Sequence, residues 1–227
     1  MSSSGWDHIQ PPDCLMKFFV MSRLKEPGCP GLVEAFIVDK GHPHLCDHYY
    51  ADNERCKRPL WHGRREGEYA PVFQPEMIAV NWDPRWRFDI CSAGQGAYFA
   101  SDRFMEISRN AGAGFVDQSP LTVRSRRGVD LVQFSYSAVI FKELDVLDVA
   151  APESLLVRDR TYGNIHRVKT LVVREGFVEP IFRFKGMSGS SHTLICSEQF
   201  RQAAGQRLKG VEFIDIDSAI WPHIKII

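Results

Sequence analysis

Imidazole and thiol side chains are concentrated in one stretch of the chain, between residues 42 and 62. These groups are the usual ligands of zinc, so the stretch could hold a structural or regulatory metal ion. The candidate ligands are His42, His44, Cys46, His48, Cys56 and His62. The first four alternate, and alternate residues of an extended strand share one face, which would crowd a single tetrahedral ion. We therefore predict a polar loop and no metal site here, and keep a small metal-binding protein or enzyme as the alternative.

Nucleophilic catalysis would need a cysteine or serine beside a histidine and an orienting acid. The possible pairs are Cys46 or Cys196 with His48, His166 or His192. Cys196 precedes a predicted helix, and the helix dipole would lower the pKa of its thiol. A second copy of the surrounding motif has Ala100 at the same position, so the motif does not require a thiol. We predict that the protein is not an enzyme, has no catalytic residues and uses no cofactor.

Aromatic and arginine side chains gather in three short segments between residues 49 and 87. Tryptophan, tyrosine and arginine are the residue types enriched at the energetic centres of protein interfaces. The predicted partner-binding residues are Tyr49, Tyr50, Trp61, Arg64, Trp82, Arg85, Trp86 and Arg87. Large aromatic side chains are also usually buried, so a role of the tryptophans as core anchors stays open.

Composition and charge narrow the class of protein. The chain has 227 residues, with 28 basic and 28 acidic side chains, so non-specific nucleic-acid binding has little electrostatic support. Apolar runs are far shorter than the ~20 residues that cross a bilayer, and the N-terminus does not resemble a signal peptide. We expect a cytoplasmic protein that binds neither nucleic acid nor membrane.

One short pattern occurs twice in the chain. Residues 100–104 and 112–117 match residues 196–200 and 210–215. Ser101 and Ser197 are good helix N-caps, and the acid that follows each serine suits the positive end of a helix dipole. A glycine, Gly112 or Gly210, fits the C-terminus of each predicted helix. The apolar face expected for the second helix comprises Phe200, Ala203, Ala204 and Leu208.

Predicted strands clearly outnumber predicted helices. Apolar runs at 15–21, 32–38 and 181–184 are strand candidates, and alternation within 131–141 predicts a half-buried strand. We predict an α+β fold, mainly antiparallel sheet with few short helices and two related strand-helix-strand units.

Two regions of the chain differ in amino-acid composition and sequence pattern. Residues 1–90 include the irregular segment rich in His, Trp and Arg, and are expected to pack on the rest of the chain. Residues 91–227 contain both copies of the repeat and are expected to form an α+β domain.

Several motifs after residue 95 occur in an order that resembles the immunity protein 11 family of bacterial polymorphic-toxin systems. They are residues 101–104, 144–148, 165–173, 181–186, 195–200 and 208–213. The similar order in that family is a capped helix, a Leu-Asp segment, a strand, an Ile-Phe-Arg segment, a second capped helix and a final strand. The resemblance covers about residues 95–215.

The resemblance implies a cytoplasmic antitoxin made beside a toxin in a secretion-system effector and immunity pair. Such a protein would bind its cognate toxin and neutralise it by steric occlusion, without catalysis and without a cofactor. We expect residues 40–90 and the surface loops to form the binding face. The oligomeric state stays open.

Overall fold

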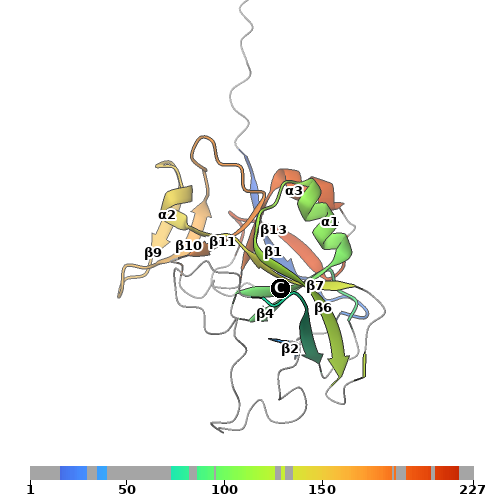
Figure 1. Ribbon diagram of the computed structural model, residues 1–227. Coiled ribbons are helices and arrows are strands. Elements are labelled where there is room, and N and C mark those ends of the chain that lie inside the picture. The colour runs from blue at the N-terminus through green and yellow to red at the C-terminus, as the bar shows by residue number, and fades with distance from the viewer. Residues whose placement is uncertain are drawn as a thin grey trace, which may run out of the picture.

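The computed structural model describes residues 16–29, 35–39, 73–81, 86–94, 96–125, 129–130, 135–185, 187, 193–205 and 208–219 (Figure 1). Short helices and mostly antiparallel sheets make up these residues, which confirms the predicted sheet-dominated α+β fold. The strand order of the larger sheet is β2-β3-β6-β7-β5-β4. Its strands are β2 (Ala35–Asp39), β3 (Met77–Asn81), β4 (Ile90–Gly94), β5 (Ala97–Ser101), β6 (Phe115–Ser125) and β7 (Tyr136–Phe141).

A second sheet has the strand order β13-β1-β12-β11-β8, and β9 pairs with β10 in a separate hairpin. The strands are β1 (Phe18–Arg23), β8 (Glu143–Asp145), β9 (Leu155–Arg158), β10 (Ile165–Thr170), β11 (Ile181–Lys185), β12 (Leu194–Ser197) and β13 (Val211–Asp215). The helices are α1 (Asp102–Asn110), α2 (Val146–Val149) and α3 (Glu198–Ala204). β1, β2 and β3 come from the first 90 residues, so that region supplies strands to both sheets. The division of the chain at residue 90 stays a prediction.

The two copies of the sequence repeat occupy equivalent places in the two sheets. The order β6-β7-β5-β4 in one sheet corresponds to β13-β1-β12-β11 in the other. The registers also correspond, since Ser101 pairs with Tyr136 at the end of β5 and Ser197 pairs with Phe18 at the end of β12. The strand nearest the N-terminus, β1, therefore completes the second unit in the place that β7 fills in the first.

Both repeat helices begin in the same way. Ser101 accepts a hydrogen bond from the backbone N–H of Phe104, and Ser197 accepts one from Phe200, each at 3.2 Å. Both serines have extended backbone angles, and an acid follows each of them in the first helical turn. The predicted N-caps are confirmed, and each one satisfies an amide that the helix itself leaves unpaired.

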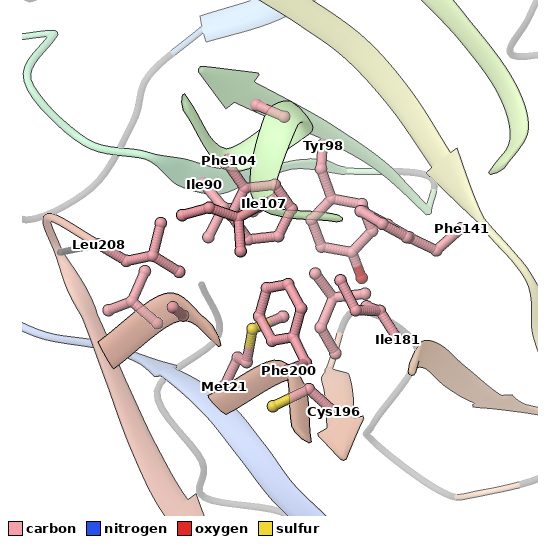
Figure 2. Packing of buried hydrophobic residues seen from close by; sticks show 14 of the residues in the cluster. Met21, Ile90, Tyr98, Phe104, Ile107, Phe141, Ile181, Cys196, Phe200 and Leu208 are labelled. Carbon is pink, nitrogen blue, oxygen red and sulfur yellow. The ribbon is translucent and has the colours of Figure 1, made fainter. Parts of the chain in front are cut away.

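The helices meet in the core between the two sheets. α1 contacts α3, and the equivalent rings of Phe104 and Phe200 lie 5.8 Å apart between centroids. Figure 2 shows Phe104 and Ile107 of α1 facing Phe200, with Tyr98 and Met21 beside them. The outer face of each sheet is covered by a further apolar cluster. Central strands such as β5 and β12 are therefore buried on both faces.

This double burial corrects the prediction of a half-buried strand at 131–141. Tyr136, Ala138 and Ile140 pack into the outer cluster of the larger sheet, while Val139 and Phe141 pack into the core shared by the two sheets. Apolar positions therefore occur consecutively in β7, because a strand covered on both faces does not need polar alternation.

The C-terminal ends of the repeat helices differ from each other. α1 ends at Gly112 as predicted, where Gly112 and Ala113 donate backbone hydrogen bonds to Arg109 and Ser108 in the Schellman arrangement. The prediction for Gly210 is wrong, because α3 ends earlier, at Gly205, and Gly210 lies in the turn before β13. The predicted apolar face is also partly wrong, because Ala203 lies within α3 but is exposed, and Leu208 is buried but lies beyond the end of the helix.

Candidate functional site

A groove of about 660 Å³ opens where four segments of the larger sheet and its neighbours meet. Residues 86–89 lie before β4, residues 101–103 begin α1, residues 135–136 begin β7, and Lys209 lies in the turn before β13. The groove therefore brings together segments up to 123 residues apart in sequence (86 to 209).

Three aromatic side chains form the apolar wall of the groove. Trp86, Phe88 and Tyr136 are 2%, 4% and 4% exposed. The Trp86 ring lies 5.1 Å from Phe88 and 5.3 Å from Tyr136 between centroids, in tilted and edge-to-face arrangements that aromatic rings prefer. The Tyr136 hydroxyl donates to the backbone carbonyl of Phe88 at 2.8 Å. Burial, followed by the charge of Asp89, raises the pKa of Tyr136, so this hydroxyl stays protonated as a donor.

Asp89 ties the groove segments to one another. Its carboxylate accepts hydrogen bonds from the Ser101 hydroxyl and from the backbone N–H of Lys209, both at 2.5 Å. Its own N–H donates to the Lys209 carbonyl, and its carbonyl accepts from the Ser101 N–H. Asp89 is 6% exposed, so the carboxylate is buried against these donors and belongs to the scaffold of the groove.

The rim of the groove is charged. Arg87, Arg103 and Asp102 are exposed, and Lys209 is partly exposed. The carboxylate of Asp89 is already paired with donors, which leaves three cations and one exposed carboxylate at the rim. The groove therefore combines an aromatic wall with a net positive rim, which favours acidic groups on a ligand or partner.

The second repeat unit has a different residue at the position of Asp89, which joins the groove segments in the first unit. Pro180 takes the place of Asp89, and its carbonyl accepts from the Ser197 N–H in the same way. Proline has no side-chain carboxylate, so the Ser197 hydroxyl cannot make the bond that Ser101 makes to Asp89. Near that helix Arg201 pairs with Glu198 at 2.6 Å and lies 4.5 Å from the centre of the Phe19 ring. The two units thus have the same backbone arrangement but different side chains near the start of the helix.

Two of the predicted partner-binding residues lie in the groove, and one of them needs correction. Arg87 is exposed on the rim, where its predicted role stays a prediction. Trp86 is buried among Phe88, Phe99 and Tyr136, so it is a core anchor and offers no exposed ring to a partner. The other predicted residues lie outside the described residues: Tyr49, Tyr50, Trp61, Arg64, Trp82 and Arg85.

The sequence analysis missed Asp89, Arg103 and Lys209. Asp89 and Lys209 are 120 residues apart, and their pairing depends on how β4 and β13 come together, which no local pattern encodes. Arg103 lies in the repeat motif, in the first turn of α1, where the predicted roles concern only the cap Ser101 and the acid Asp102.

The candidate metal ligands, from His42 to His62, also lie outside the described residues. Within the part of the chain that the structure describes, no group of three His, Cys, Asp or Glu side chains could hold a metal ion.

Cys196 differs from the thiol expected at a helix N-terminus. It is fully buried, and this burial raises its pKa well above the ordinary value, so the dipole of α3 does not activate it. Burial likewise raises the pKa of Cys91 to about 12. Both thiols are buried side chains of the sheets and are held in the protonated form.

No protein-family model matches the chain, and no curated protein matches it. The resemblance to the immunity protein 11 family therefore stays a prediction from the motifs. Among the described residues, no helix is long and apolar enough to cross a membrane.

Proposed function

We propose that the protein is an immunity protein, which binds a cognate bacterial toxin in the cytoplasm and neutralises it by steric occlusion. The proposal rests on the order of motifs that resembles the immunity protein 11 family. Those motifs fall on α1, on β8 with α2, on β10, β11 and β12, and on α3 and β13. They build the scaffold, and two of them, residues 101–104 and 208–213, also line the groove.

The observation that carries the proposal is the groove beside α1. Arginine is one of the residue types that contribute most to protein interfaces, and here Arg87, Arg103 and Lys209 form a positive rim around the groove. Asp89 fixes the segments through buried hydrogen bonds, so the surface is formed before a partner arrives. A preformed surface avoids part of the ordering cost of association.

Co-expression with the product of the adjacent gene tests this function. We expect that product to arrest growth alone, and growth to recover when the present chain is expressed with it. The two proteins should then elute together in size-exclusion chromatography. Failure to restore growth, together with separate elution, would overturn the proposal.

A charge reversal on the rim tests the role of the groove. Arg103→Glu should weaken the complex at least tenfold, because it places a negative charge where an acidic partner surface is expected. Arg109→Glu is the matched control, since Arg109 is exposed near the other end of the same helix. Equal affinities of the two variants would exclude the groove as the contact surface.

A further inference from the structure

The groove is smaller than the surface that a specific protein complex usually covers. Specific protein interfaces use about 20–30 residues on each side. The groove is lined by ten residues, several of which are buried. A second docking surface is therefore expected on the molecule.

Exposed apolar side chains indicate where that surface lies. Four of the seven large apolar side chains exposed among the described residues are Leu147, Leu155, Tyr162 and Val178. Leu147 lies on α2, Leu155 on β9 and Tyr162 in the turn between β9 and β10. Figure 1 shows α2, β9 and β10 together at the left of the molecule. Tyr162 is the most accessible of them, with 82% of its surface exposed.

The same hairpin is strongly basic. Residues 155–170 hold Arg158, Arg160, Arg167 and Lys169 but a single acid, Asp159, whereas the whole chain has equal numbers of basic and acidic residues. The Asp159 carboxylate accepts from the backbone N–H groups of Thr161 and Tyr162, at 3.0 and 2.5 Å. These bonds stabilise the ionised carboxylate, but the basic side chains outnumber it, so the hairpin has a net positive charge.

The turn that carries Tyr162 is fixed by hydrogen bonds. In addition to the bonds of the Asp159 carboxylate, the N–H of Asp159 donates to the carbonyl of Asn164, and the Arg158 guanidinium donates to the carbonyl of Gly163 at 2.9 Å. These bonds order the backbone at the tip of the hairpin, so less backbone freedom is lost on binding.

We propose that the β9–β10 hairpin is a second docking surface, which inserts Tyr162 into an acidic cleft of a protein partner. The inference rests on the proposed function, under which that partner is the toxin. Tyrosine and arginine are the residue types enriched at protein interfaces. A nucleic acid is the less suitable ligand, because the balanced charge of the whole chain gives it little long-range attraction.

Titration of the purified, catalytically inactivated product of the adjacent gene tests the inference. Tyr162→Ala and Arg160→Glu should each raise Kd at least tenfold, and the wild-type Kd should rise with salt. Val129→Ala and Arg109→Glu are matched controls, at an exposed apolar and an exposed basic position away from the hairpin. They should stay within threefold of wild type.

The possible failures can be told apart. If the wild-type protein does not bind the toxin, the proposed function itself fails and the inference fails with it. If the toxin binds all variants within threefold, only the inference is overturned. A 20-base-pair DNA duplex serves as the competing probe at 150 mM salt. Loss of duplex binding in the hairpin variants with unchanged toxin binding would assign the hairpin to nucleic acid and overturn the inference.

Discussion

At the scale of single residues, Asp89 is the group on which the groove depends. Its buried carboxylate joins the cap of α1 to the turn before β13, and its backbone bonds to the same two places. This junction at Asp89 fixes the shape of the surface that carries the charged rim residues. Sequence reasoning found Arg87 but not Asp89, because an isolated acid before a strand has no local signature.

Gly210, beside this junction, should tolerate no side chain. Its φ is +77°, and a Cβ would lie 3.1 Å from the Cys29 sulfur and 3.3 Å from Phe88 Cβ. Gly112 is the matched control, because its φ is +80° but a Cβ there meets nothing within 4 Å. Gly112→Ala should cost about 1–2 kcal/mol from backbone strain alone. Gly210→Ala should cost more in urea denaturation, and equal costs would contradict the crowding at this turn.

The sheet cysteines should be inert in the folded protein. A thiol with a pKa of about 12, as at Cys91, is ionised in only about one molecule in ten thousand at pH 8. Cys91 and Cys196 are also buried, so we expect iodoacetamide to leave both unmodified at pH 8 and to modify both in 6 M guanidinium. Peptide mass spectrometry measures this, and rapid modification of either thiol in the native protein would contradict the buried positions.

At the scale of elements, the repeat helices show what a sequence can predict. A capping serine and an acid act within one turn, so Ser101 and Ser197 could be recognised without tertiary structure. The end of α3 was not predicted, since two glycines follow the helix and the sequence alone does not distinguish Gly205, which ends it, from Gly210. The burial of both faces of β7 likewise depends on layers contributed by distant segments.

Removing the two caps should have unequal effects. Ser197→Ala should cost about 1 kcal/mol, since it removes one capping bond. Ser101→Ala should cost more, because it also leaves the buried carboxylate of Asp89 without its hydroxyl donor. Thermal or urea unfolding measures the difference, and a larger loss for Ser197→Ala would contradict the role of Asp89.

At the scale of the whole molecule, the two repeat units have the same strand order and share one hydrophobic core. The second unit is completed by β1, which comes from the other end of the chain. The sequence indicated the fold class and the related units, but the placement of β1 between β12 and β13 is a long-range pairing with no local signal. The groove follows from this assembly, since Lys209 reaches it only when the second unit packs beside the first.

Hydrogen–deuterium exchange of the protein with and without the inactivated toxin tests the central proposal most directly. We predict slower exchange in the complex at residues 86–88 and 101–103, where the rim of the groove would be covered. Exchange at residues 109–110, which are exposed near the other end of α1, should not change. A complex that forms while both groove segments exchange at their free rates would contradict the assignment of this groove as the toxin-binding surface.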